Sequence, residues 1–189
     1  ANMEIGSLDH TIGHAIVLAS EEVIDGQFHD QFIVDPIQGG AGTSVNMNAN
    51  EVIANRALKI IGKEKGDYDV IHPNTHVNMA QSTNDAFPTA IHIATLQFIT
   101  RLEKTLKDLA DTFFDKGKEF DDVIKMGRTH LQDAIPIRLG QEFHAYGRVI
   151  SRDYKRISNL YEPLYEVNLG ATAVGTGLNA DTQYMKRSV

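Results

Sequence analysis

The apolar positions of this chain recur at helical spacing over much of its length. In residues 1–25 an apolar stripe with steps near three and four predicts a helix, with Asp9 as a capping residue and Gly26 as its stop. Gly13 weakens the interior of this segment and leaves a break near it open. The stripe consists of Ile12, Ile16, Val17, Val23 and Ile24.

Two much longer helical runs follow. The first extends from about Pro88 to Lys118 and predicts a helix about 45 Å long. The second is expected to begin at Pro136 and to end or kink at Pro163, with near-heptad apolar spacing. Two such helices cannot cover both of their apolar stripes. We therefore expect a mainly α fold with a multi-helix bundle, completed by further chain or other subunits; an ordinary antiparallel helix pair is the alternative.

Composition narrows the class of protein. The 189 residues carry a net charge of −7, which argues against a general nucleic-acid-binding surface. Without cysteine, a disulfide framework, a thiolate zinc site and a cysteine nucleophile are all excluded. No apolar run approaches the roughly 20 residues of a membrane span, and no signal peptide is visible at the start. These features predict a cytoplasmic protein without a membrane partner.

Three polar loops hold the candidate chemistry. The first, residues 39–44, is glycine-rich and leads into a helix start with Asn and hydroxyl side chains, where backbone amides attract anions. It matches neither the P-loop nor the dinucleotide fingerprint, and a purely structural turn is the alternative. The second, residues 81–85, places four consecutive capping residues before a long helix. One is enough to cap the helix, so the others could hold a ligand carboxylate there; capping alone is the alternative.

The third loop, residues 127–133, reads Gly-Arg-Thr-His-Leu-Gln-Asp. Such a set of polar groups is costly to bury without a purpose, and His130 is either functional or a structural hydrogen-bonding residue. His10 and His14 are spaced for metal binding on a helix, although a solvated face is the better interpretation. No set of histidines and carboxylates has convincing metal-ligand spacing, so no metal site is expected.

The three loops and residues 170–179, Gly-Ala-Thr-Ala-Val-Gly-Thr-Gly-Leu-Asn, together resemble the aspartase/fumarase superfamily in order and spacing. Within it, the chain most resembles the bacterial aspartate ammonia-lyase branch. Three short differences favour that branch over class II fumarase: Gly-Ala-Gly-Thr-Ser in the first loop, Ser-Thr-Asn in the second and Gly-Ala-Thr in the fourth motif.

The resemblance implies the deamination of L-aspartate to fumarate through an aci-carboxylate, without a cofactor. It implies that Thr43, Ser82 and Thr83 hold the carboxylate that takes up charge. Asn84, Thr129 and His130 would contact the amino group, and Thr129 could also reach the other carboxylate. A neutral His130 would accept from the ammonium. The resemblance also implies a homotetramer whose active sites draw on three subunits.

One element of the superfamily pattern is absent. The loop Gly-Ser-Ser-x-Met-Pro-x-Lys-x-Asn, which supplies the serine base, does not occur in the 189 residues. We therefore expect no catalytic base in this chain and no lyase activity from it alone. The resemblance divides the chain into residues 1–83, part of an N-terminal helical domain, and residues 84–189, the first part of the central bundle. A fumarase and a non-catalytic helical scaffold remain as alternative functions.

Overall fold

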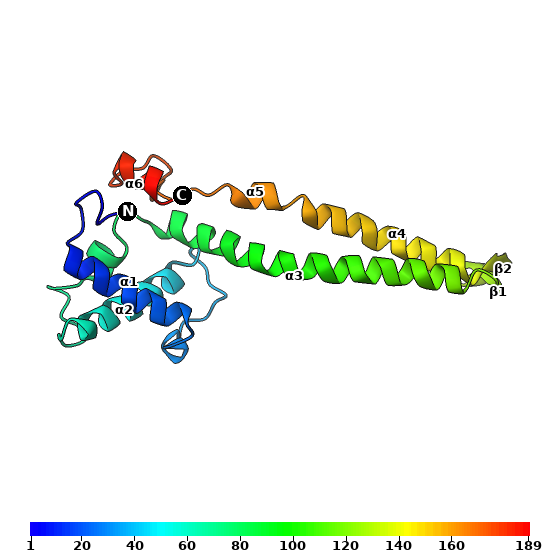
Figure 1. Cartoon of the computed structure of the whole chain (residues 1–189), viewed down its shortest axis with the longest axis horizontal. Helices are drawn as coiled ribbons and strands as arrows, with labels where there is room; N and C mark the ends of the chain where they lie inside the picture. The colour runs from blue at the N-terminus through cyan, green and yellow to red at the C-terminus, as the bar shows by residue number, and fades with distance from the viewer. The chain divides into compact units, whose positions relative to one another are not determined.

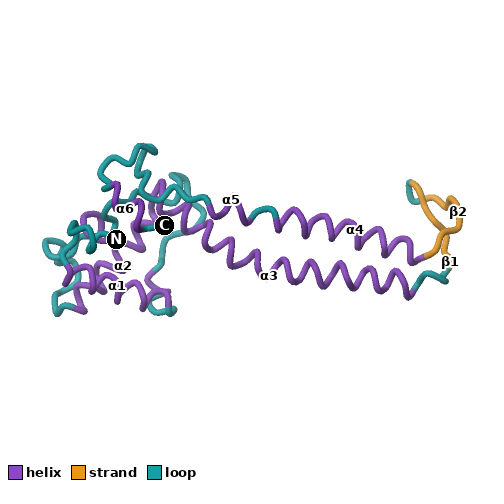
Figure 2. The backbone as a smooth tube through the Cα atoms, turned by 45° about the horizontal axis from the view of Figure 1, so that its top comes forward, coloured by secondary structure: helices purple, strands orange, loops and turns teal.

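The computed structural model describes all 189 residues and divides them into two compact units. Unit 1 comprises residues 1–91 and 167–189, and unit 2 comprises residues 92–166. Helices dominate both units and the only sheet has two strands, so the predicted mainly α class is confirmed (Figures 1 and 2). The domain boundary expected between residues 83 and 84 stays a prediction.

In unit 1, helices α1 (His10–Ile24) and α2 (Thr43–Ile60) pack side by side (Figure 1). Asp9 caps α1 as predicted, because its carboxylate accepts from the amides of Thr11 and Ile12 at 2.8 and 3.1 Å. The helix continues through Gly13 without a break. A side chain at Gly13 would collide with Met3, so this glycine gives the N-terminal turn its room against α1.

Small side chains make this close packing possible. The buried cluster between the two helices is built largely from alanines, and its members are Ala15, Ala19, Ala54, Ala57, Leu58 and Ile71. Alanine keeps the backbones near each other, while Leu58 and Ile71 are the largest side chains of the cluster. The core of unit 1 therefore lies on the inner faces of α1 and α2.

A π-helical turn, η2 (Pro73–Val77), packs against α2 and leads toward α3 (Thr83–Glu119). The His72 ring nitrogen Nδ1 accepts from the amides of Asn74 and Thr75, at 3.1 and 3.3 Å. Nδ1 of His76 accepts from the His72 amide at 2.8 Å. Both histidines therefore hold backbone in place, and the structure contains no group of three or more side chains suited to a metal ion.

Unit 2 is built on the long part of α3 and on α4 (Leu139–Ser158), which are joined by a hairpin. Aromatic rings fill the contact: Phe113 lies 5.7 Å from Tyr146, and Phe120 lies 5.2 Å from Phe143, measured between ring centroids. Glycines let the backbones approach. A Cβ at Gly140 would lie 2.2 Å from the Gly117 carbonyl oxygen.

The structure corrects the predicted start of the second long helix. Pro136 lies in strand β2 (Gln132–Arg138), which pairs antiparallel with β1 (Ile124–Thr129), and α4 begins only at Leu139. Proline is tolerated there because a two-stranded ribbon has free edges. The far end also differs: α4 ends at Ser158, and Pro163 lies inside the short α5 (Tyr161–Tyr165).

Part of the stripe predicted on the first long helix stays uncovered. Phe113 and Leu106 are partly buried, but Phe98 is 68% exposed, and Leu102 and Leu109 are also exposed. The buried Ile99 and Ala110 lie on a neighbouring face of the same helix. The helix thus has two apolar faces, and one chain covers only one of them.

Candidate functional site

The start of α3 is a capping box built from the second polar loop. The Ser82 hydroxyl accepts from the Asn84 amide at 3.3 Å, and the Ser82 amide donates to the Asp85 carboxylate oxygen Oδ1 at 2.8 Å. Reciprocal bonds of this kind satisfy backbone groups that the first helical turn leaves free. The predicted cap is therefore confirmed, with Ser82 and Asp85 as its two members.

Asp85 is fully buried and reaches beyond its own helix. Its second carboxylate oxygen, Oδ2, accepts from the amides of Gly170 and Thr172 at 3.0 and 2.8 Å. Three backbone amides therefore surround one carboxylate at the positive end of α3, an arrangement that compensates a buried negative charge. The second loop and the fourth motif are joined through this one side chain.

Asn84 forms a second bridge between the same two segments. Its side-chain amide Nδ2 donates to the Ala173 carbonyl at 2.6 Å, and its own carbonyl accepts from the Asn168 side chain at 3.0 Å. The carbonyl oxygen of the Asn84 side chain, Oδ1, accepts no hydrogen bond within the chain. This oxygen is available to a ligand that carries N–H or O–H groups.

A hollow of about 760 Å³ opens beside these bridges, and we refer to it as the α3 hollow. Ser82 and Thr83 line it, and the Thr83 hydroxyl makes no hydrogen bond within the chain. Amide and hydroxyl side chains line it together with apolar ones, among them Met47, Met79, Val174 and Leu178. Its full lining is Asn46, Met47, Asn74, Thr75, Asn78, Met79, Ala80, Gln81, Ser82, Thr83, Thr172, Ala173, Val174, Leu178 and Asn179.

The glycine-rich first loop ends at the start of α2, as predicted, and it touches α3. Gly42 has a φ of 83° and lies against the Phe87 ring. A Cβ at this position would lie 2.3 Å from the nearest ring atom. Thr43, the first residue of α2, is exposed, and its hydroxyl donates to the Gly40 carbonyl at 2.9 Å. Thr43 therefore belongs to the same unit as Ser82, Thr83 and Asn84 but lies outside the α3 hollow.

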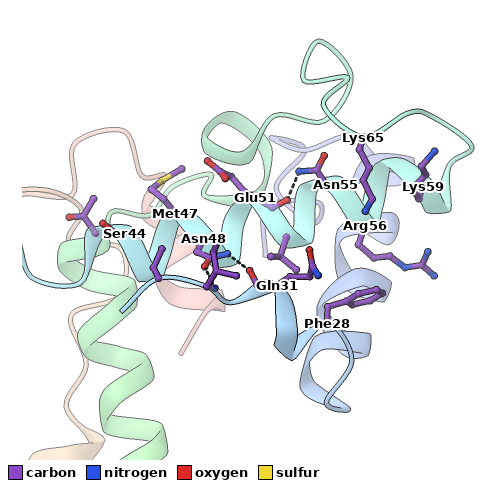
Figure 3. A pocket seen from close by; sticks show the side chains of 14 residues that line it. Phe28, Gln31, Ser44, Met47, Asn48, Glu51, Asn55, Arg56, Lys59 and Lys65 are labelled. Atoms are coloured by element: carbon purple, nitrogen blue, oxygen red, sulfur yellow. Dashed lines mark hydrogen bonds between the residues drawn. The ribbon is translucent and has the colours of Figure 1, made fainter. Parts of the chain in front are cut away.

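Thr43 instead lines a second hollow of about 790 Å³ along α2, the α2 groove, shown in Figure 3. Asn48 holds one wall: it accepts from the Ile33 amide at 3.1 Å and donates to the Gln31 carbonyl at 3.0 Å. Arg56 pairs with Glu22, and this hydrogen-bonded pairing lowers the pKa of Glu22. Met47 borders both hollows, so the two are neighbours along one helix.

Thr129 and His130 lie at the tip of the β1–β2 hairpin in unit 2. Thr129 pairs with Gln132, which leaves His130 and Leu131 as a two-residue loop with φ values of 48° and 63°. Positive φ at both positions is the type I′ arrangement, which Asn and Gly normally occupy. A bulky residue such as Leu131 is strained there, and such strain clusters at functional sites.

The third loop is not buried, contrary to the argument made from its polarity. Its side chains from Arg128 to Asp133 are all exposed, with Arg128 and Asp133 paired across the strands at 3.1 Å. The polar groups thus carry no desolvation cost within this chain. What marks the loop is its backbone conformation rather than its burial.

Ser82, Thr83 and Asn84 therefore lie together at the start of α3. Thr43 lies in the same unit but lines the α2 groove. Thr129 and His130 belong to unit 2. Reasoning from the sequence missed the roles of Asp85 and of residues 170–173. An acidic residue three positions after Ser82 is a signal for the capping box. No sequence signal shows that the same carboxylate reaches residue 172.

Sequence comparison with known families gives one decisive match. The Lyase family matches residues 1–189, the whole chain. The chain belongs to the lyase family. This lyase chain is 66% identical over all of its 189 residues to the aspartate ammonia-lyase of Bacillus subtilis, of which it covers 40%. It is 48% identical to the aspartate ammonia-lyase of Escherichia coli, again over 40% of that protein.

Solved structures agree with this assignment of the lyase chain. A fumarate lyase:delta crystallin from Brucella melitensis, bound to cobalt, aligns with a TM-score of 0.89 at 50% identity, over 98% of this chain and 40% of that one. The class II fumarase of Schistosoma mansoni aligns with a TM-score of 0.87 at 36% identity, over 98% and 39%. The chain thus spans about two fifths of the length of these relatives. None of its helices has the length and hydropathy of a membrane span.

Proposed function

We propose that this chain supplies the substrate-carboxylate segment of an aspartate ammonia-lyase, which converts L-aspartate to fumarate and ammonia. The observation that carries the proposal is the start of α3, where the unpaired Thr83 hydroxyl and Ser82 line a hollow at the positive end of a long helix. The relatives with the same activity in their names are up to 66% identical over the full chain.

The chemistry explains why hydroxyl groups belong there. Removal of the proton beside a carboxylate converts that group to a doubly charged aci-carboxylate, so the site must stabilise charge that grows during the reaction. Donors already in place for that charge accelerate such a step, each by on the order of a hundredfold or more. We assign this role to Thr43, Ser82 and Thr83.

The amino group of the substrate is assigned to Asn84, Thr129 and His130. The free Oδ1 of Asn84 accepts hydrogen bonds but cannot donate them, so it suits an ammonium group and not a carboxylate. Thr129 can also reach the second carboxylate. The resemblance implies active sites drawn from several subunits, and we propose that these residues meet in that assembly.

The same proposal includes the assembly and location. In a homotetramer, other subunits would cover the exposed face of α3 that carries Phe98 and Leu102. Each active site would then be formed by residues of three subunits. A cytoplasmic location follows from the resemblance to bacterial ammonia-lyases. The fumarase alternative keeps support from the structural match at 36% identity.

The test uses the full-length protein that carries this chain. Incubation with L-aspartate should produce fumarate, followed by its ultraviolet absorbance, while L-malate should give none. If fumarate forms from L-malate and not from L-aspartate, the protein is a fumarase. If neither compound gives fumarate, the non-catalytic helical scaffold is the remaining alternative. The isolated 189 residues serve as the control and should produce no fumarate, because they lack the serine-loop pattern.

A further inference from the structure

A strained residue faces the α3 hollow from the fourth motif. Thr172 is 6% exposed and has a φ of 60°, the left-handed region, which is a genuine outlier for a β-branched side chain. Such a conformation persists only where the surrounding structure holds it. The Asp85 carboxylate does so here, because it accepts from the Thr172 amide at 2.8 Å and from the Gly170 amide at 3.0 Å.

The next residue, Ala173, lines the α3 hollow and carries this constraint to the exposed Asn84. The Ala173 carbonyl accepts from Asn84 Nδ2 at 2.6 Å. Turning the Asn84 side-chain amide over would place two acceptor oxygens at that distance, so the contact decides which end of the amide faces outward. The outward end is Oδ1, a hydrogen-bond acceptor.

We propose that Asp85 is a positioning residue that orients Asn84 toward the amino group of the substrate. It holds Thr172 in the left-handed conformation, this conformation presents the Ala173 carbonyl, and the carbonyl fixes the Asn84 amide with its acceptor outward. This inference rests on the proposed ammonia-lyase function. It adds the fourth motif to the site as the element that selects a substrate N–H donor at this position.

The first test exploits the strain at residue 172 in the full-length protein. In Asp85→Asn the new NH₂ group must face one or two of the backbone amides, so the turn should lose its hold. A misplacement of this kind should lower kcat/KM for L-aspartate by about 100-fold. Glycine adopts positive φ freely. Adding Thr172→Gly to Asp85→Asn should therefore raise kcat/KM about tenfold above that of Asp85→Asn alone. The single variant Thr172→Gly is the reference.

The rescue separates positioning from a general structural role. If Asp85 only stabilised the start of α3, or acted only through its charge, a glycine at residue 172 would restore nothing. A double variant as slow as Asp85→Asn overturns the proposal, as does an Asp85→Asn protein with unchanged kcat/KM.

A second variant avoids the buried core, because Asn84 is exposed. Asn84→Leu keeps the size of the side chain and adds no charge, but it neither donates to the Ala173 carbonyl nor accepts from an amino group. We expect kcat/KM for L-aspartate to fall at least about tenfold. Binding of succinate, a dicarboxylate without an amino group, should weaken less, measured as its inhibition constant. Equal losses for both ligands, or a smaller loss for L-aspartate, would contradict the assignment.

Failure of the function and failure of the positioning role are distinguishable. A wild-type protein that does not deaminate L-aspartate refutes the function. The contact itself is then tested by hydrogen exchange without any substrate: the Gly170 and Thr172 amides should be protected in the wild type and exchange faster in Asp85→Asn. Equal protection in both proteins overturns the role of Asp85.

Discussion

At the scale of single residues, the start of α3 separates the groups that hold the backbone from those left for a ligand. The buried Asp85 carboxylate uses both oxygens on backbone amides, and the Ser82 hydroxyl accepts from Asn84. The Thr83 hydroxyl makes no hydrogen bond to the backbone, although Thr83 is buried. Its removal should therefore affect ligand chemistry far more than folding.

We predict that Thr83→Val in the full-length protein lowers kcat/KM for L-aspartate by about 100-fold or more, because a donor to the developing charge is lost. Valine keeps the shape and needs no partner, so the unfolding midpoint should stay close to that of the wild type. Thr83→Ser, which retains the hydroxyl, is the matched control and should keep most of the activity. Equal activity of the valine and serine variants would show that Thr83 does not meet the substrate.

At the scale of elements, the long helices follow from the sequence because each has an apolar stripe with a period near 3.6 residues. The hairpin does not, because most side chains of β1 and β2 are exposed and no alternation of polar and apolar residues records a buried face. The sequence does not predict its turn either, because His130 and Leu131 occupy the positions where Asn and Gly are usual. A run of polar residues around such a turn is indistinguishable from a loop.

The same limit applies to the candidate site. Ser82, Thr83 and Asn84 are adjacent in sequence, so their common location was predictable from the loop itself. The contact between Asp85 and Thr172 joins residues 87 positions apart. Local spacing carries no information on such a pair, and only the folded unit brings it together.

The contact of α3 with α4 gives a prediction for Gly140. Alanine normally favours a helix over glycine by about 1 kcal/mol. At Gly140 the added methyl would meet the Gly117 carbonyl, which is backbone and cannot rotate away. Gly140→Ala should therefore destabilise the chain by about 2 kcal/mol in urea unfolding. Gly39→Ala, where the methyl enters open space, should change stability by less than about 0.5 kcal/mol; a stabilised Gly140→Ala would refute the packing argument.

The turn η2 gives a prediction on pH. Burial, with the nearby His72, lowers the pKa of His76 below its usual value. The unfolded chain then binds the proton more readily than the folded one, near pH 6.5. The stability that neutral His76 contributes is full above that pH and is lost as the pH falls toward the depressed folded pKa.

His76→Asn should reduce this loss of stability between pH 7.5 and 5.5, measured by urea unfolding at each pH. The asparagine oxygen can accept from the His72 amide in place of the ring nitrogen. His29→Asn, which removes an exposed histidine outside η2, is the matched control. Parallel pH curves for the wild type and His76→Asn would contradict the role assigned to His76.

At the scale of the whole molecule, the exposed face of α3 concerns association rather than folding. Phe98, Leu102 and Leu109 lie on one side of the helix and find no cover within their unit. Contiguous apolar surface of this kind favours contact with other chains. The charge of −7 acts against association only weakly at ordinary salt concentrations.

We predict that the wild-type chain sediments as species larger than a monomer, and that Phe98→Lys with Leu102→Lys shifts it toward the monomer. The control makes the same change in net charge on exposed residues of α3 away from this face, as Gln97→Lys with Asp108→Asn, and should keep the association. A wild type that stays monomeric at high concentration would show that this face needs no cover.

The backbone at the hairpin tip also bears on which residues can be substituted there. Since φ is positive at residues 130 and 131, glycine, asparagine, aspartate and histidine are the residues that adopt this turn with least strain. A library that randomises residue 130 over all amino acids would therefore sample mostly strained tips. Varying Leu131 to glycine first would widen the choice at its neighbour, at the expense of a looser loop.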